Sequence, residues 1–207
     1  MPDPLGEAVA GLRDGGLVAY PTETVWGLAA DATSDAAQQT LRAWKGRGDH
    51  SPVSILLENV AELGPLEFEF GGGARRLAQA FWPGPITLVL TCRRHFALGV
   101  AREDGAVGVR CSSHPLAMAL ARRCRSEGVG PITATSLNRS GDAPARTWEE
   151  ARSLCEEGGV QLLNVEGAEA GADRETTVID VSGAQPEVLR WGALEEDVAP
   201  VLRELRA

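Results

Sequence analysis

Two polar segments of this 207-residue chain combine residue types that can bind an anion. Lys45 and Arg47 place two cations within one turn at the expected end of a helix, where they could bind an anion or only interact with the negative end of the helix dipole. Ser136 and Asn138 follow a short apolar run and supply a hydroxyl and an amide. The backbone amides of such a turn can bind an oxyanion, although the same pattern is typical of an ordinary Asx turn.

A third segment, residues 21–28, has the sequence Pro-Thr-Glu-Thr-Val-Trp-Gly-Leu and directly follows an apolar run. It places two hydroxyls, a carboxylate and an aromatic ring next to one another. Ligands collect at the carboxyl ends of strands in α/β sheets, which favours a binding loop. The alternative is a capped turn with Trp26 in the core, and the residues alone do not separate the two.

Lys45 is notable because the other 19 basic residues of the chain are all arginine. It could be a leftover of codon usage. It could also mark a position that needs a compact ammonium on a flexible stem, which a planar guanidinium does not replace.

Other catalytic motifs have little support. The chain contains no G-x-x-x-x-G-K-[ST], G-x-G-x-x-G or G-x-S-x-G sequence, so these phosphate loops and a serine nucleophile are not indicated. Two C-x-x-H pairs, Cys92 with His95 and Cys111 with His114, could hold zinc. Both directly follow apolar strand-like runs, and structural cysteines beside exposed histidines are the favoured interpretation.

Composition narrows the class of protein. A net charge of -9 argues against general coating of nucleic acid, although a local basic cleft is compatible with it. We expect no membrane association, because no apolar run reaches the 18 residues of a membrane span, and no secretory signal, because residues 1–4 lack its basic and apolar regions. Four scattered cysteines without a C-x-x-C pair favour a reducing environment. The expected location is the cytoplasm.

The pattern of apolar residues predicts one α/β domain over residues 1–207 with a mixed sheet flanked by helices. Asp3, Ser34, Ser113 and Thr147 are the expected helix caps, with Glu150 completing a capping box. Helices are expected at residues 4–13, 34–45, 74–82, 113–125 and 147–154, and from residue 195 onward. Strands are expected at residues 17–20, 53–57, 86–91, 107–111, 132–135, 161–165, 177–181 and 188–190.

These motifs occur in an order that resembles the YrdC-like family, whose standalone members are threonylcarbamoyl-AMP synthases. The resemblance covers about residues 10–195, nearly the whole chain. It implies an open, twisted α/β sheet with a concave, electropositive cleft. The motifs that carry it are P-T-E-T-V-W-G-L, K-G-R, W-P-G-P-I-T, V-x-V-R-x-x-x-H-P-L, T-S-L-N-R-S-G, T-T-V-I-D and L-R-W-G.

The resemblance implies a nucleotidyltransferase that joins L-threonine, bicarbonate and ATP into threonylcarbamoyl-AMP and releases pyrophosphate. Mg²⁺ would accompany ATP, and the sequence identifies no protein ligand for it. The product would feed the t6A37 modification of tRNA through a downstream threonylcarbamoyltransferase complex, and a local contact with tRNA or other RNA is possible.

The resemblance also assigns site residues. The family's Lys, Arg, Ser and Asn tetrad is matched by catalytic residues that also hold ATP, and further ATP and threonine contacts align elsewhere in the chain. The tetrad is Lys45, Arg47, Ser136 and Asn138; the additional ATP contacts are Ser51 and Arg190; the threonine contacts are Thr24, Arg110, Ala134 and Thr176.

Departures from the family pattern leave alternatives open. Trp26 replaces a smaller aromatic ring, and Leu56 replaces a histidine that lies beside threonine in many relatives, so that contact and the choice between threonine and serine are in doubt. Leu137, Trp191 and the segment 48–53 also differ. The competing functions are a carbamoyl-adenylate-forming maturation enzyme and a non-catalytic RNA-binding or ribosome-maturation factor, which the net charge of -9 disfavours.

Overall fold

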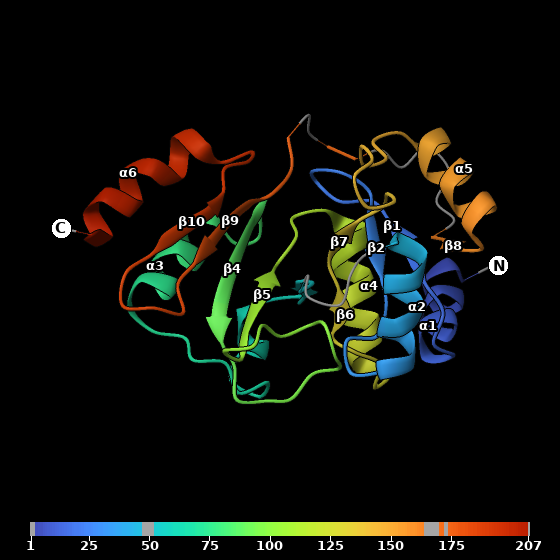
Figure 1. Cartoon of the computed structure of the whole chain (residues 1–207), viewed down its shortest axis with the longest axis horizontal. Helices are drawn as coiled ribbons and strands as arrows, with labels where there is room; N and C mark the ends of the chain where they lie inside the picture. The colour runs from blue at the N-terminus through green and yellow to red at the C-terminus, as the bar shows by residue number, and fades with distance from the viewer. Residues whose placement is uncertain (1–2, 47–51, 164–169, 172–173, 207) are drawn as a thin grey trace.

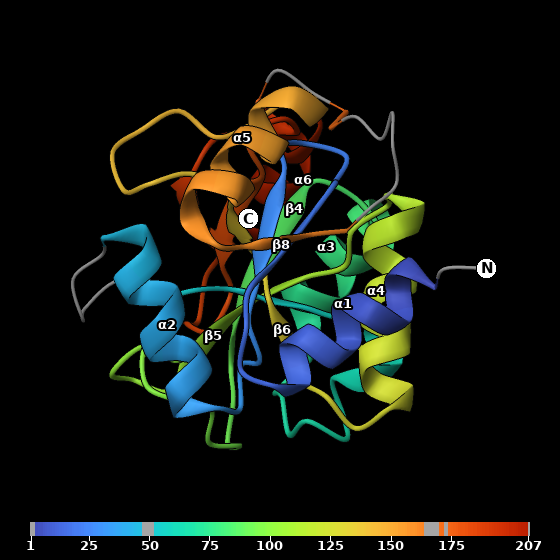
Figure 2. The same cartoon turned by 90° about the vertical axis from the view of Figure 1, so that its right-hand side faces the viewer.

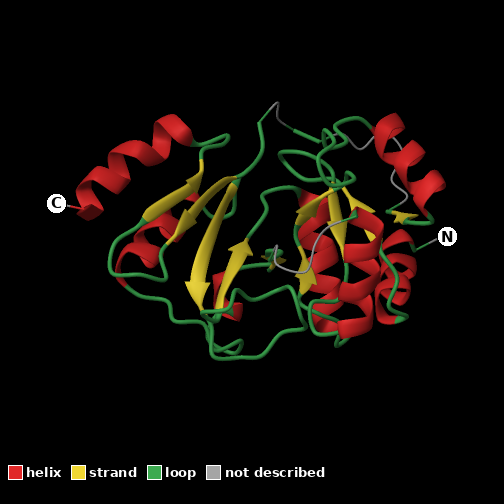
Figure 3. Ribbon diagram, viewed as in Figure 1, coloured by secondary structure: helices red, strands yellow, loops and turns green. Residues whose placement is uncertain are grey.

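The computed structural model describes residues 3–46, 52–163, 170–171 and 174–206, and within them the strands form two mixed sheets. One sheet has the strand order β7-β2-β1-β8 and the other has the order β10-β9-β4-β5-β3-β6. Figure 1 shows the smaller sheet and its flanking helices towards the N-terminal end of the molecule, and the larger sheet with α3 (Gly72–Phe81) and α6 (Glu195–Arg206) towards the C-terminal end. Figure 3 shows the same separation of the strands into two groups.

The four-stranded sheet is buried on both faces. Its members are β1 (Val18–Tyr20), β2 (Gly27–Ala29), β7 (Thr135–Ser136) and β8 (Gln161–Leu162). Strand side chains alternate between faces, so Leu17 and Ala19 enter one core cluster while Val18 and Tyr20 enter the other. This double burial explains why the segment reads as a continuous apolar run.

Different helices pack on the two faces of the four-stranded sheet. Helices α1 (Pro4–Arg13) and α4 (Pro115–Ser126) pack on the Val18 face, whereas α2 (Asp35–Lys45) and α5 (Trp148–Gly158) contribute to the other core. Figure 2 shows α2 and α1 on opposite sides of the small sheet.

The six-stranded sheet provides the second half of the molecule. Its central strand β4 (Ile86–Thr91) pairs antiparallel with β5 (Ala106–Arg110) and parallel with β9 (Thr177–Asp180). Helix α3 and the C-terminal helix α6 contribute apolar residues to its core. The remaining elements are β3 (Ile55–Leu56), β6 (Ile132–Thr133), β10 (Glu187–Arg190), η1 (Val60–Glu62), α3 (Gly72–Phe81) and α6 (Glu195–Arg206).

Most predicted helix caps are present. The Asp3 carboxylate accepts from Gly6 N, Ser34 accepts from Ala37 N, and Thr147 with Glu150 forms the predicted capping box. The predicted cap at Ser113 is wrong. The cap of α4 is His114, whose Nδ1 accepts from Leu116 N at 3.2 Å, because Pro115 occupies the first helical position and the cap must directly precede it.

The α/β class is confirmed, but the strands divide differently from the sequence prediction. The predicted strand 132–135 is two strands, since β6 belongs to the large sheet and β7 to the small one. Ala134 lies at the crossing, where its N–H donates to Ser54 O at 2.7 Å. The end of the predicted loop 21–28 is strand β2, which pairs antiparallel with β1 and makes the segment the connection of a hairpin.

Within the described residues, no helix is long and apolar enough to span a bilayer. The four cysteines are buried as free thiols. Burial raises the pKa of Cys111, Cys124 and Cys155 to about 12, so these groups remain protonated thiols and not reactive thiolates.

Candidate active site

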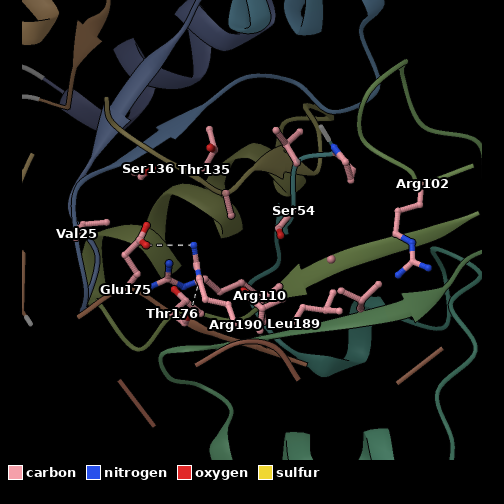
Figure 4. Close-up of a pocket in the computed structure, with 18 of the residues that line it drawn as sticks. Val25, Ser54, Arg102, Arg110, Thr135, Ser136, Glu175, Thr176, Leu189 and Arg190 are labelled. Atoms are coloured by element: carbon pink, nitrogen blue, oxygen red, sulfur yellow. Dashed lines mark hydrogen bonds and ion pairs between the residues drawn. The ribbon is translucent and has the colours of Figure 1, made fainter. Parts of the chain in front are cut away.

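A pocket of about 310 Å³ lies between the two sheets and takes residues from both. Figure 4 shows Thr135 and Ser136 facing Arg110, Thr176 and Arg190 across it, with Ser54 between them and Arg102 at the far end. The apolar part of the wall includes Tyr20, Val25, Trp26, Val53, Val89, Val178 and Leu189.

The end of helix α2 and the loop after β7 meet at the small-sheet wall. The Lys45 side chain is buried, and its Nζ donates to Ser136 O at 2.6 Å and to Asn138 Oδ1 at 3.1 Å. Ser136 Oγ donates to the same amide oxygen at 2.6 Å. The helix ends here because Gly46 adopts the left-handed conformation, with φ of 64°. An ammonium, a hydroxyl and an amide from segments about 90 positions apart therefore form one cluster.

The loop 136–142 is fastened to the helix end by several further bonds. Asn138 Nδ2 donates to Arg139 O at 2.9 Å and to Asp142 O at 2.8 Å, and Ser140 N donates to Lys45 O at 2.7 Å. The Arg139 guanidinium lies over the Trp44 ring at 4.2 Å from its centroid, a favourable cation–π arrangement. These contacts join the loop to the end of helix α2 at several points.

Arg110 lies on the opposite wall at the end of β5 and is only 7% exposed. Its Nη2 donates to Thr24 Oγ1 at 2.9 Å and to Thr22 Oγ1 at 3.2 Å, and it lies 3.0 Å from Glu23 Oε1. Ser112 donates its hydroxyl to the other Glu23 oxygen. The segment 21–28 thus fixes Arg110 in place, and Trp26 of the same segment both packs on Trp148 and lines the pocket.

Arg190 enters the pocket through an irregularity in strand β10. The register of β10 on β9 shifts between Val188 and Arg190, as in a β-bulge. Consecutive strand residues normally face opposite sides, but here both Leu189 and Arg190 line the pocket. Arg190 Nε donates to Thr176 O at 3.0 Å, and Nη1 lies 3.3 Å from Glu175 Oε2.

Arg102 closes the far end of the pocket. It forms ion pairs with Asp180 and Asp104. Burial of Asp180 raises its pKa, but hydrogen bonds from Ser182 and Arg102 outweigh this and keep the pKa below its usual value. The same hydrogen bond to Asp180 raises the pKa of Arg102, so both groups are charged.

The structure brings most of the predicted site residues together. Arg110, Ala134, Ser136, Thr176 and Arg190 line the pocket. Thr24 contacts Arg110 directly, and Lys45 and Asn138 contact Ser136. Arg47 and Ser51 lie outside the described residues.

Four residues of this region are absent from the predicted site: Glu23, Ser54, Arg102 and Glu175. Ser54 faces Gly108, where an added Cβ would lie 2.4 Å from Ser54 Oγ, so the glycine permits a close approach of two strands. Glu23 could have been found because it belongs to the 21–28 motif, and Glu175 because it directly precedes Thr176. No feature of the sequence indicated Ser54 or Arg102. Leu56 is buried in the core behind α4.

The geometry of the pocket suits an anionic and polar ligand. Arginines on one wall could bind carboxylate or phosphate through bidentate hydrogen bonds, and the Lys45 cluster on the other wall could bind a phosphate. Among the described residues, no three His, Cys, Asp or Glu side chains gather into a metal-binding group.

The chain is similar in sequence and in fold to known proteins. The Sua5/YciO/YrdC family model, described as telomere recombination, matches residues 10–192. A Chromohalobacter salexigens protein named threonylcarbamoyl-AMP synthase is 35% identical over 184 residues, covering 88% of this chain and 95% of that protein.

Two solved structures share the fold. Pyrococcus abyssi Sua5 complexed with L-threonine matches with a TM-score of 0.85 and 32% identity, covering 97% of this chain and 58% of the Sua5 chain. Escherichia coli YciO matches with a TM-score of 0.79 and 25% identity, covering 93% of this chain and 92% of that one.

Proposed function

This chain belongs to the Sua5/YciO/YrdC family, and from that premise we propose that it is a threonylcarbamoyl-AMP synthase. The reaction joins L-threonine, bicarbonate and ATP and releases pyrophosphate. One observation carries the proposal. Residues that the family resemblance assigns to ATP and residues that it assigns to threonine line a single pocket, although they come from four separate segments of the chain.

The amino-acid side of the pocket is built around Arg110. We propose that its guanidinium binds the threonine carboxylate, as Thr24, Ala134 and Thr176 position the rest of the molecule. Support comes from the burial of Arg110 and its bonds to the 21–28 segment, since a preorganised guanidinium loses little freedom when a carboxylate binds. The L-threonine complex of Pyrococcus abyssi Sua5 is consistent with an amino-acid site in this fold.

The nucleotide side is built around Lys45, Ser136 and Asn138, with Arg47 and Ser51 as further proposed ATP contacts. The threonine amine takes up CO₂ supplied by bicarbonate and releases a proton, which gives a carbamate. A carbamate oxygen then attacks the α-phosphorus of ATP in line, the bond from that phosphorus to the bridging oxygen breaks, and pyrophosphate leaves. Fixed positive charge at the phosphates and correct positioning would supply most of the acceleration.

Further parts of the proposal concern the surroundings of the reaction. Mg²⁺ would enter with ATP as part of the substrate. The cleft would be electropositive, as the family resemblance implies. The product would pass to a threonylcarbamoyltransferase complex for t6A37 modification of tRNA, in the cytoplasm, and RNA could contact the cleft.

The test is a turnover assay with the full chain, ATP, Mg²⁺, bicarbonate and each amino acid in turn, measuring pyrophosphate release and the adenylate product. We expect release to require both threonine and bicarbonate, with a Lys45→Ala variant as the inactive control. Release that is independent of threonine and bicarbonate would contradict the proposal. A requirement for carbamoyl phosphate would favour the maturation enzyme, and salt-sensitive RNA binding without turnover would favour the RNA-binding factor.

A further inference from the structure

Each of the three arginines that line the described pocket is paired with a carboxylate, but the three pairs differ in strength. Arg110 is paired with Glu23, Arg102 with Asp180, and Arg190 with Glu175. A ligand anion that binds one of these arginines must therefore displace the acidic side chain or use an N–H group that the pair leaves open, such as the buried Nε–H of Arg110, for which the described structure shows no hydrogen-bond partner. Whether a ligand anion can displace the carboxylate depends on how firmly the protein holds that carboxylate.

Two of the three carboxylates are held firmly. Glu23 is 14% exposed and also accepts from Ser112, and Asp180 is 12% exposed and also accepts from the backbone N–H and hydroxyl of Ser182. Removing either from its arginine would leave a buried charge without its partner, which is strongly unfavourable. These two carboxylates stay where they are when a ligand binds.

Glu175 is different. Its side chain is 41% exposed, its Arg190 partner is 45% exposed, and the pair is 3.3 Å apart. Within the described structure no hydrogen bond to the Glu175 carboxylate accompanies this ion pair. An exposed pair of this kind contributes at most about 1 kcal/mol, so the carboxylate can turn away at little cost.

Glu175 also has a suitable second partner. An amino acid brings an ammonium as well as a carboxylate, and Glu175 is the one acidic side chain among the described residues that line the pocket. It directly precedes Thr176, a proposed threonine contact. We propose that Glu175 exchanges partners: it pairs with Arg190 in the free protein and with the ammonium of the amino acid once a nucleotide phosphate occupies Arg190. This inference rests on the proposed function and adds a positioning residue to it.

Partner exchange couples the two binding sites. The nucleotide that takes Arg190 releases Glu175 for the ammonium, so each ligand strengthens the binding of the other by the same factor. Because the coupling arises from breaking one exposed ion pair, the expected factor is about three- to fivefold. Glu175→Gln keeps the size of the side chain and removes its charge, so it abolishes the coupling. It also tightens nucleotide binding in the absence of threonine, because Arg190 no longer has a charged competitor.

The experiment is calorimetric titration of the full chain with L-threonine and with the non-hydrolysable analogue α,β-methylene ATP, each alone and in the presence of the other, without bicarbonate. We expect the analogue to lower the Kd of threonine about three- to fivefold in the wild type and to leave it unchanged in Glu175→Gln. A threonine analogue with a hydroxyl in place of the ammonium should show no coupling in the wild type.

The matched control is Glu187→Gln, which removes an exposed carboxylate from β10 outside the pocket and should retain the coupling. Wild-type protein that binds both ligands without coupling, or Glu175→Gln that keeps it, overturns the exchange while leaving the proposed function intact. Wild-type protein that binds neither ligand overturns both.

Discussion

The two walls of the pocket hold their polar groups in different ways. On the small-sheet wall, Ser136 donates its hydroxyl to the Asn138 amide oxygen, and the Lys45 ammonium donates to that same oxygen and to the Ser136 carbonyl. On the large-sheet wall, Arg110 is held by a carboxylate 87 positions away in the chain, Glu23. The first wall depends on hydrogen bonds that gather a hydroxyl, an amide and a carbonyl around one ammonium, whereas the second depends on ion pairs between arginines and carboxylates. Substitutions on the second wall should therefore affect stability more, and those on the first should affect the reaction more.

The largest effect is expected from Glu23→Ala. The substitution leaves the Arg110 guanidinium buried without its carboxylate, and breaking a buried pair in this way typically costs about 3 kcal/mol or more. The free energy of unfolding, measured by urea denaturation, should fall by about that amount.

The control for this substitution is Glu69→Ala, which removes the partner of Arg93 in an ion pair whose side chains are 55% and 75% exposed and should change stability by less than about 1 kcal/mol. If the two variants lose equal stability, the second wall does not depend on its buried pair.

A smaller free-energy change, seen in activity and not in stability, is expected from Lys45→Arg. The buried ammonium fits between Ser136 O and Asn138 Oδ1, and a planar guanidinium has a different shape and a longer stem. We expect adenylate formation to fall about 100-fold, a loss typical for one preorganised electrostatic group, while the urea midpoint changes little. Near-normal turnover would show that the position needs only a positive charge and would return Lys45 to a leftover of codon usage.

The smallest effect is expected from Glu175→Ala. This carboxylate belongs to the charge-paired wall, but its ion pair is exposed, so the free energy of unfolding should change by less than about 1 kcal/mol. The same denaturation experiment as for Glu23→Ala measures it. A loss as large as that of the Glu23 variant would remove the distinction between a fixed and an exchangeable pair.

Features that depend on neighbours along the chain could be predicted from the amino-acid sequence alone. Helix ends followed from caps such as Ser34 and the Thr147–Glu150 box, because a capping bond spans only three residues. The apolar run at β1 predicted a buried strand for the same local reason. The motif residues Arg110, Ser136 and Arg190 were identifiable from their order in the chain, and the structure brings them to one pocket.

Tertiary structure decided which groups those residues meet. The split of 132–135 at Ala134, the bulge that turns Leu189 and Arg190 to the same side, and the pairing of Arg190 with Glu175 depend on strand register and packing. The sequence does not show which arginine a given carboxylate will pair with. The fold decides this, because it sets the distance between the two groups and their burial. Those two quantities separate the fixed Glu23 from the exposed Glu175, because the strength of an ion pair depends on its exposure to water more than on the residues that form it.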